Sequence, residues 1–599
     1  MKEALKLILL GLALCIAGSF VLDDFYRSLV IEICIFSLLA QSVNILYGYM
    51  GVLSFGQSLF FGLSSSIVAL GIHYTTKPLL LWVVLALFSC SLVAVIFGYA
   101  LSRLEGHNFV IFSVLLSLFP YLLSNTFSNF TGGDDGLSLD FHLTDNFSFN
   151  SILNNPLYFY FFTVLIVIVA TVLTWTLYKG SFGLISKGIR ENQFRMELLG
   201  YNLAKHKLYV YIISGLFAGV SGILYVFFSK YLSSSFFHWS LSGEAIVWAS
   251  FLGRGTFWGP LVGTAILLLL KDELSSYTGI YPIIIGFLLI LSISSSKLVA
   301  KILSVKYLFF HIVPFKNYMQ TSSINIDITI DTIEPTEIDV LASEVFKSNN
   351  LTLNFEHNSI LNDISVKASL DTGLSIKLIN NDIKTLSLMP HSKKKMAIAI
   401  VGENGSGKTT FLNVLSGIQK GFYGEVKILE KNISKKTNKY QSFFGDYYTL
   451  PIGRTFQRVE LFQNLSVREN VLLGLLASQA ETDKVIFDKH YCHLKSIGNT
   501  FGLNHLFYSQ VSELSYGQKK ILELALVIAA DSKLLLLDEP FNGVGTQEKN
   551  ILLKILQNLS ASHPMVLVEH DRDTTIELTD FIITLENGVF TNVQYSTEL

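Results

Sequence analysis

Long apolar runs dominate the first half of the sequence. LWVVLALFSCSLVAVIFGYAL and FTVLIVIVATVLTWTL, for example, contain no charged residue. Because the apolar core of a bilayer takes about 20 residues of α-helix, runs of this length predict membrane spans. Residues 340–599 instead mix Lys, Asp and Glu throughout, as in a water-soluble protein. The chain is therefore expected to fold as a helical membrane half followed by a soluble half.

We expect about 8–10 spans, including broken or re-entrant segments. Lys2 and Lys6 precede the first apolar run as in a signal peptide, but the polytopic region that follows favours an uncleaved span. The candidate spans lie near residues 4–22, 28–47, 51–73, 79–102, 108–128, 156–178, 208–229, 244–270 and 281–297.

The distribution of Lys and Arg predicts the orientation of these spans. Residues 131–155 contain several Asp and no Lys or Arg, so they are expected outside, whereas the basic segment 179–207 is expected inside. The soluble half must also lie inside. Single crossings by every later span would place it outside, so 244–270, interrupted by GRGTFWGP at 253–260, is expected to be re-entrant or to cross twice.

Polar residues and glycines within the apolar segments are candidates for a substrate pathway. Glu32 and Glu244 also lie in or near predicted spans. Buried polar groups in a membrane mark either a pathway or hydrogen bonds that only hold helices together, and both readings remain open. The pathway candidates are Gln41, Asn44, Gly56, Gln57, Gly253, Gly255 and Gly259.

Composition sets the domain boundaries and excludes two classes of site. We expect a membrane domain at 1–305, a linker at 306–345 and a soluble domain at 346–599. The net charge of −2, without a basic stripe, argues against nucleic-acid binding. The cysteines show no metal-binding spacing and are interpreted as packing residues; they are Cys15, Cys34, Cys90 and Cys492.

A phosphate-binding loop follows the apolar run MAIAIV at 396–401. GENGSGKTT satisfies the pattern G-x-x-x-x-G-K-[ST], in which glycines let backbone N–H groups wrap a phosphate. Lys408 is expected to reach the β- and γ-phosphates of ATP, and the Thr409 hydroxyl to bind Mg²⁺. The predicted ATP contacts in this loop are Gly402, Glu403, Asn404, Gly405, Ser406, Gly407, Lys408, Thr409 and Thr410.

Two further strands end in residues suited to ATP hydrolysis. LLLLDEP, at 534–540, places Asp538 to hold Mg²⁺ and Glu539 to act as the general base on water. MVLVEHD, at 565–571, brings His570 toward the γ-phosphate. The motifs RTFQRVELF and LSYGQKK lie between the loop and these strands.

The ordered motifs at Lys408, Gln457, Ser515, Asp538 and His570 resemble an ABC ATPase. RTFQRVELFQNLSVRENVLLG with LSYGQ resembles the ATPase of branched-chain amino acid ABC importers. GYMGVLSFGQSLFFGL, FTGGDDGL and FLGRGTFWGPLVGTAI resemble the permease of the same system. The resemblance implies a polytopic all-α permease fused to an α/β P-loop ATPase that hydrolyses ATP with Mg²⁺.

The resemblance also assigns roles by position. Gln457 would sense Mg²⁺ and contact the permease, while Ser515 and Gly517 would approach the γ-phosphate on an opposing ATPase. Phe355 would stack on adenine. The segment IRENQFRMELLG would be the coupling helix that docks on the ATPase, with an ordinary surface helix as the alternative; its key residues are Arg190, Glu191, Asn192 and Gly200.

Three departures qualify the resemblance. LSFGQ at 53–57 repeats the letters of LSYGQ, but it lies in an apolar span and is expected to belong to the permease alone. In FNGVGTQE, Gly545 stands where the family usually has Asn or Asp, which puts the turnover rate in question. The residues between 366 and 396 include an insertion relative to the family, for which the sequence suggests no role.

The family pattern implies an assembly with two permeases and two ATPases. The partners would be a second copy of the chain or, favoured by the resemblance, a separate permease and a separate ATPase. A periplasmic or surface solute-binding protein would deliver substrate to the transporter, which would lie in the bacterial inner membrane with its ATPase domain in the cytoplasm. Branched-chain or other apolar amino acids are the expected cargo, with urea or short amides as the alternative. An exporter half-transporter would show longer unbroken spans, and a non-transporting regulator would lack the acids at 538 and 539.

Overall fold

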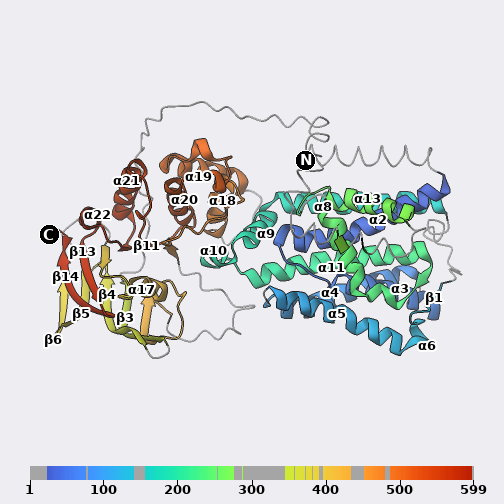
Figure 1. Cartoon of the computed structure of the whole chain (residues 1–599), viewed down its shortest axis with the longest axis horizontal. Coiled ribbons are helices and arrows are strands. Elements are labelled where there is room, and N and C mark those ends of the chain that lie inside the picture. Colours follow the sequence, from blue (N-terminus) through green and yellow to red (C-terminus); the bar gives the residue numbers. More distant parts are fainter. Residues whose placement is uncertain are drawn as a thin grey trace. The chain divides into compact units, whose positions relative to one another are not determined.

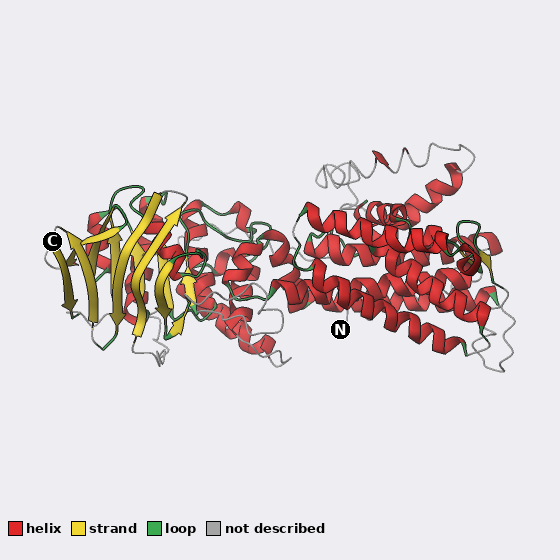
Figure 2. Cartoon of the chain, turned by 90° about the horizontal axis from the view of Figure 1, so that it is seen from below, coloured by secondary structure: helices red, strands yellow, loops and turns green. Residues whose placement is uncertain are grey.

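The computed structural model describes most of the chain, and its longest gaps are residues 1–22 and 288–343. The described residues are 23–75, 78–104, 106–139, 155–251, 254–274, 283, 286–287, 344–355, 358–371, 373–380, 382–389, 396–433, 451–478 and 486–596. The fold divides into two compact units. One is helical and the other contains the large sheets, as Figures 1 and 2 show. Residues 191–202 belong to the second unit, although the sequence around them is that of the first.

The first unit, termed here the membrane unit, is built of long apolar helices. Five of them have the length and hydropathy of membrane spans among the described residues: Asp24–Tyr49, Leu79–Ala100, His107–Thr126, Pro156–Lys179 and Leu203–Ser229. The candidate near 4–22 and nearly all of that near 281–297 lie outside the described residues. The helices of this unit are α2 (Asp24–Val43), η1 (Asn44–Tyr49), α3 (Gln57–Tyr74), α4 (Leu79–Leu101), α5 (His107–Thr126), α6 (Ser128–Thr131), α8 (Pro156–Lys179), α9 (Ser181–Glu191), α11 (Leu203–Ser229), η2 (Ser234–Phe237), α12 (Trp239–Ser250) and α13 (Gly259–Leu274). A short ladder of β1 (Leu137–Ser138) and β2 (Tyr231–Leu232) completes it.

Small residues let α11 approach its neighbours closely. A Cβ placed on Gly222 would lie 2.3 Å from the Phe61 carbonyl oxygen of α3, so only glycine fits there. The Ser65 hydroxyl donates to the Gly222 carbonyl at 3.0 Å, and Ser221 donates to Ile35 of α2 at 2.7 Å. Small and hydroxylated residues take this role in membranes, where the hydrophobic effect does not hold helices together.

The predicted break in the segment 244–270 is confirmed. α12 has 12 residues and α13 has 16, so at about 1.5 Å per residue neither crosses a core of about 30 Å alone. The turn between them packs on the π-helix η1. Asn44 donates to the Thr256 carbonyl at 3.0 Å and accepts from the Gly255 backbone N–H at 3.2 Å. Non-helical backbone is thereby satisfied within the protein, as the membrane requires.

The second unit, termed here the ATPase unit, contains two sheets. The first, mostly parallel, has the order β10 (Ile452–Arg454), β11 (Leu534–Asp538), β12 (Met565–Val568), β7 (Ala397–Val401), β13 (Phe581–Glu586) and β14 (Val589–Tyr595), with β13 and β14 antiparallel. The second, antiparallel, has the order β6 (Asp382–Leu388), β5 (Gly373–Asn380), β4 (Asn358–Ser369), β3 (Glu344–Phe355), β8 (Tyr423–Ile428) and β9 (Lys431–Asn432). The helices are α10 (Gln193–Leu198), α17 (Lys408–Leu415), α18 (Val467–Ser478), α19 (Ile486–Thr500), α20 (Tyr516–Ala529), α21 (Thr546–Ser562) and α22 (Arg572–Leu578), with short 3-10 turns η3 (Asn504–Leu506) and η4 (Val511–Glu513).

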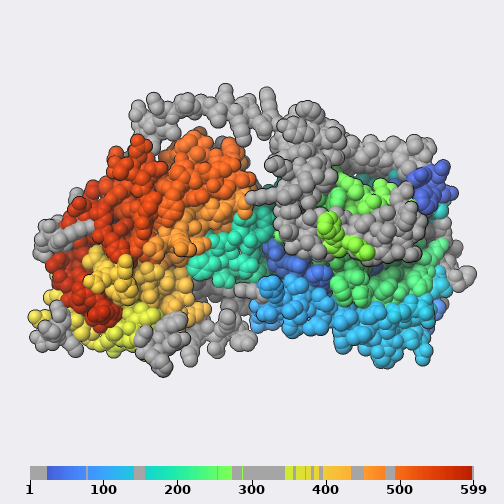
Figure 3. All heavy atoms as spheres, viewed as in Figure 1, coloured from blue at the N-terminus to red at the C-terminus, as the bar shows by residue number. Residues whose placement is uncertain are grey.

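The expected insertion between 366 and 396 forms strands β5 and β6 within its described residues. β5 pairs with β4, and β6 pairs with β5, which extends the antiparallel sheet at its edge. Leu374 and Ile376 of β5 are buried in one core with Ile398 of the parallel sheet. The strands of the two sheets lie side by side at one end of the unit, yellow and red in Figure 3. Strand β5 of the insertion is therefore part of the ATPase core, whereas residues 384–387 of β6 are exposed.

The expected linker at 306–345 lies outside the described residues except for its end. Glu344 and Val345 already belong to β3, and Val345 is buried in the core of the ATPase unit. The ATPase unit thus begins at least two residues before the boundary expected at 346.

Candidate nucleotide site

The phosphate-binding loop connects the buried strand β7 to helix α17. Gly405 and Gly407 adopt positive φ angles of 86° and 103°, which glycine accepts without steric cost. Gly407 is the N-cap of α17, so the helix N-terminus faces the loop, as in anion-binding sites. Lys408 is buried, and its Nζ donates to the carbonyl oxygens of Gly402 at 2.8 Å and Glu403 at 2.7 Å. Burial lowers the pKa of Lys408, against the opposing effect of nearby carboxylates.

The rest of the loop continues the same cradle. Glu403 and Asn404 are exposed, Ser406 is buried and Thr410 is half-buried. The Ser406 backbone N–H donates to the Glu403 carbonyl at 3.2 Å, which closes the turn. The loop therefore presents backbone N–H groups and a lysine around one small volume, an arrangement suited to phosphate.

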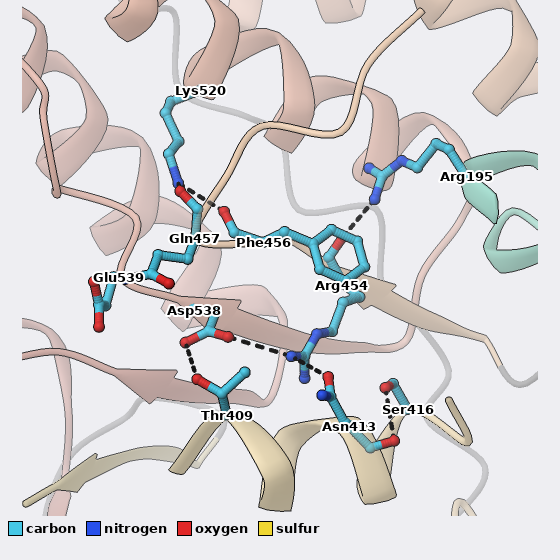
Figure 4. Close-up of polar contacts among 10 residues, drawn as sticks. All are labelled: Arg195, Thr409, Asn413, Ser416, Arg454, Phe456, Gln457, Lys520, Asp538 and Glu539. Atoms are coloured by element: carbon cyan, nitrogen blue, oxygen red, sulfur yellow. Dashed lines mark hydrogen bonds and ion pairs between the residues drawn. The ribbon is translucent and has the colours of Figure 1, made fainter. Parts of the chain in front are cut away.

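Asp538 ends the buried strand β11 and lies beside this loop. Thr409 Oγ1 donates to Asp538 Oδ1 at 3.4 Å, and Arg454 Nη2 donates to Oδ2 at 3.3 Å (Figure 4). Arg454 also donates to Asn413 of α17 at 2.9 Å. Burial raises the pKa of Asp538, while Arg454 and the Thr409 hydrogen bond act in the opposite direction. Arg454 thus supplies the positive charge that favours the ionised carboxylate.

Glu539 gathers three side chains from separate elements. Gln457 Nε2 donates to its Oε2 at 3.0 Å, Asn542 Nδ2 donates to the same oxygen at 2.8 Å, and His570 Nε2 lies 3.3 Å from Oε1. Burial raises the pKa of Glu539, but the hydrogen bonds from Asn542 and Gln457 and the presence of His570 outweigh it, and the pKa is lowered overall. Glu539 is consequently ionised at neutral pH and able to accept a proton.

The oxygen atoms at this corner fit Mg²⁺. The Thr409 hydroxyl and the Asp538 carboxylate are adjacent, and the Gln457 side chain lies next to Glu539 (Figure 4). Hydroxyl, carboxylate and amide oxygens are the hard ligands that Mg²⁺ prefers, and phosphate and water complete its shell. Among the described residues, no group of three His, Cys, Asp or Glu side chains is placed to hold a metal. A Mg²⁺ ion that is partly coordinated by nucleotide phosphates does not need three such side chains.

The LSYGQ signature begins helix α20. Ser515 is the N-cap, and its hydroxyl accepts the Gln518 backbone N–H in a capping box. The same hydroxyl donates to Glu548 of α21 at 3.4 Å, and a Cβ on Gly517 would meet the Glu548 side chain at 2.7 Å. Neither contact involves the phosphate-binding loop. Ser515 and Tyr516, at the start of α20, are exposed in this chain.

Helix α20 also holds the backbone of the Gln457 loop. Lys520 Nζ donates to the carbonyl oxygens of Phe456 at 2.8 Å and Gln457 at 3.2 Å, and the Tyr516 hydroxyl donates to Gln457 at 3.1 Å. Phe355 is the last residue of β3, paired with Asn358 in the turn to β4. Its side chain lies outside the described part of the structure.

The segment 191–202 docks on the ATPase unit. Asn192 caps α10 and its Nδ2 donates to Glu460 Oε2 at 2.6 Å, while Asn464 Nδ2 donates to Glu191 Oε2 at 2.6 Å. The Tyr201 hydroxyl donates to the Leu473 carbonyl of α18 at 2.7 Å. The contacts therefore extend over the whole segment.

The ends of this segment differ in their surroundings. Gly200 follows Leu199, the C-cap of α10, and adopts a φ of 93°; its backbone N–H donates to the Glu197 carbonyl. Arg190, one residue before the segment, belongs to the membrane unit, where its Nη1 donates to the Gly48 carbonyl of η1 at 2.7 Å. Successive residues are thus anchored in the two units.

The permease candidates are placed at helix junctions and buried contacts. Gln41 is buried on α2, and Gln57, the first residue of α3, accepts from the Ser42 hydroxyl at 3.4 Å. Gly56 is the N-cap of α3, Gly255 has a φ of 70° beside η1, and Gly259 begins α13; Gly253 lies outside the described residues. The first LSFGQ is therefore a junction within the membrane unit.

Sequence reasoning missed several residues of the site. Arg454, which binds Asp538, is the first residue of RTFQRVELF, but the sequence suggested no role for it. Asn542, which binds Glu539, lies in FNGVGTQE, where only Gly545 drew attention. Arg195 and Glu523 were also missed. No spacing rule connects an arginine before a membrane helix to a glutamate within an ATPase helix, so only the fold reveals the pair.

Two protein-family models match the chain. "Branched-chain amino acid transport system / permease component" matches residues 26–293, and "ABC transporter" matches residues 386–542. A probable branched-chain amino acid transport ATP-binding protein, LivG, from Archaeoglobus fulgidus is 30% identical over 213 residues, which cover 34% of this chain and 81% of that protein.

ATP-binding proteins named for the import of other substrates are similar too. The sulfate/thiosulfate import ATP-binding protein CysA 2 of Agrobacterium fabrum is 27% identical, and the spermidine/putrescine import ATP-binding protein PotA of Borreliella afzelii is 29% identical. Each match covers 37% of this chain and 60% of the relative, so the chain spans less than two thirds of their length. A solved ATP-binding cassette of an ABC transporter, in its ADP conformation, is 23% identical with a TM-score of 0.32, over 43% of this chain and 92% of that chain.

The site geometry and the family matches agree on the class of protein. The C-terminal half is an ABC ATPase, which binds ATP and hydrolyses it to drive transport, and the N-terminal half is a multi-pass membrane permease domain. The chain belongs to the ABC transporters of the branched-chain amino acid system and joins the permease and the ATP-binding subunit in one polypeptide.

Proposed function

We propose that the chain is a subunit of an ATP-driven importer of branched-chain or other apolar amino acids. The observation that carries the proposal is the match of residues 26–293 to the permease family of branched-chain amino acid transport systems. The relative from Archaeoglobus fulgidus is also named for branched-chain amino acid transport. Cassettes that serve sulfate/thiosulfate and spermidine/putrescine importers match at similar identity. The permease half is therefore the part that supports the choice of substrate.

The catalytic roles follow from the contacts around Glu539. This carboxylate accepts the proton of the attacking water, while Gln457, Asn542 and His570 hold it in place. The glycine loop and Lys408 bind the phosphates. Thr409, Gln457 and Asp538 would hold Mg²⁺, which supplies charge compensation for the phosphate oxygens when bound. His570, 46% exposed at its side chain, is free to face the γ-phosphate.

The segment 191–202 acts as the coupling helix. It contacts the loop after Gln457, and that loop is in turn bound by Lys520 of the signature helix. A change at the nucleotide therefore has a short path to the segment. ATP binding closes the cassettes, the segment transmits the motion and hydrolysis resets it, which gives alternating access.

The assembly requires partners beyond this chain. Ser515 is exposed at the N-terminus of α20, and its hydroxyl contacts Glu548 of α21, which fits a signature that completes the ATP site of another cassette. The partners are a separate permease, a separate ATPase and a solute-binding protein that delivers substrate from outside. The complex lies in the bacterial inner membrane with its ATPases in the cytoplasm.

Uptake by membrane vesicles tests the proposal. Vesicles that contain the full transporter should accumulate labelled leucine or valine when ATP is present, and Glu539→Gln should reduce uptake at least about a hundredfold because no carboxylate remains to take the proton. Glu586→Gln, at the exposed last residue of β13, is the matched control and should behave as wild type. Equal uptake by Glu539→Gln and wild type would contradict the proposal. Uptake of urea without uptake of leucine or valine would show that the substrate is urea or a short amide rather than an apolar amino acid.

A further inference from the structure

Arg195 is the most deeply buried contact of the segment 191–202. The residue is 1% exposed, and its Nη1 donates to the main-chain carbonyl of Arg454 at 2.7 Å (Figure 4). The same nitrogen lies 3.9 Å from Oε1 of Glu523, whose side chain is fully buried on α20. The segment 191–202 thus places a full positive charge in the interior of the ATPase unit.

The surroundings of this pair make the charges interdependent. Glu523 Oε1 also accepts the Glu460 backbone N–H at 3.3 Å, and Lys520 is a second cation on the same helix. Burial raises the pKa of Glu523 to about 7, while Arg195 and Lys520 lower it. Burial lowers the pKa of Arg195, while Glu523 and Glu460 raise it. Arg195 therefore favours the ionised form of Glu523, and Glu523 offsets part of the cost of burying the guanidinium.

A cavity of about 150 Å³ borders the guanidinium, lined among others by Leu199, Gly453 and Val527. Arg195 Nε and Nη2 have no acceptor among the described protein atoms. The cavity is large enough for water to reach these groups. It also leaves room for a different side chain, so replacement of Arg195 need not cause overpacking.

We infer that Arg195 is the residue by which this cassette recognises its coupling segment, with the Glu523 carboxylate and the Arg454 carbonyl as its receptor. The inference rests on the coupling role proposed above. An assembly of two permeases contains two coupling segments, and a buried charge pair discriminates between them. A segment with a neutral residue at this position removes the guanidinium from beside the buried Glu523 carboxylate, and a segment with an acidic residue there places a second negative charge beside it. The partner that fits is a short helix with a basic residue three places after its N-cap.

The position of the receptor connects recognition to the site. Arg454 accepts Arg195 through its main chain while its side chain binds Asp538 and Asn413. Correct docking therefore holds the residue that neutralises the Mg²⁺-binding carboxylate. Arg195 is a positioning residue, since it touches neither nucleotide nor water itself.

A double-mutant cycle in the full transporter tests the inference. Arg195→Met, Glu523→Gln and the double variant are compared by hydrogen exchange of residues 191–202, with ATP hydrolysis per substrate imported as a second measure. Each single variant should speed exchange of the segment at least about tenfold, because it leaves one buried charge unmatched. The double variant should recover most of the protection, since no charge then remains in the pair, and Arg195→Lys should retain part of it.

The control pair is Glu344 and Lys367, which are 3.4 Å apart and partly exposed on the antiparallel sheet. Glu344→Gln and Lys367→Met should combine additively with little effect on the segment. Unchanged exchange in Arg195→Met, or additive losses in the double variant, would overturn the inference. Neither exchange result would contradict the proposed function, which is tested separately by the loss of uptake in Glu539→Gln. Failure of the inference and failure of the proposed function are therefore distinguishable.

Discussion

At the scale of single residues, Glu523 makes a prediction about pH. Its pKa in the folded chain is about 7 because of burial, against an ordinary value of 4.5. Between these values the folded chain holds a proton that the unfolded chain has released, so the free energy of unfolding falls as pH rises. Glu523→Gln lacks this term. The unfolding midpoint of wild type relative to Glu523→Gln should therefore decrease between pH 4.5 and 7 and change little above that range.

Thermal unfolding of the detergent-solubilised full chain at several pH values measures this difference. Glu586→Gln is the control, because this exposed carboxylate has no buried partner to lose. If the unfolding midpoints of wild type and Glu523→Gln changed in parallel between pH 4.5 and 7, Glu523 would not be the group that binds a proton on folding.

The residues of the nucleotide site were predictable because their spacing reflects chemistry. A glycine loop after a buried strand and two acids after another appear in the sequence as motifs, and the structure brings Thr409, Asp538 and Glu539 to one corner of the parallel sheet. Arg195 and Glu523 form no motif. Their pairing depends on where residues 191–202 dock, and that docking is a tertiary result that a local pattern does not express.

At the scale of elements, the inserted strands β5 and β6 should differ in their importance for stability. Ile376 of β5 is 1% exposed in the core of the ATPase unit, whereas Thr385 of β6 is exposed. Ile376→Ala should lower the free energy of unfolding by about 2–5 kcal/mol through the lost contacts and the cavity that remains. Thr385→Ala should change it by less than about 0.5 kcal/mol. Denaturant unfolding of the full chain measures both, and equal effects would contradict the assignment of β5 to the core.

The elements of the membrane unit were predictable to different degrees. Apolar runs located most spans within a few residues, and the glycine-rich GRGTFWGP predicted the break between α12 and α13. The π-helix at 44–49 was not predicted; in the structure Asn44, its first residue, forms hydrogen bonds with the backbone of Gly255 and Thr256, more than 200 residues later. A pairing between distant segments determines it.

At the scale of the whole molecule, one chain supplies one phosphate-binding loop and one signature. In an assembly with a separate ATPase, Lys408→Ala disables the ATP site that uses this chain's loop, and Ser515→Arg disables the site that uses its signature. Co-expression of the two variants should then give no more ATP hydrolysis than either variant alone, because every complex still carries one defect. Two copies of the chain would behave differently: a mixed pair contains one site with an intact loop and an intact signature. Random pairing makes about half of the pairs mixed, and each mixed pair has one intact site of two. Recovery toward about a quarter of the wild-type rate would therefore show that the chain assembles with itself, and it would replace the separate ATPase as the proposed partner.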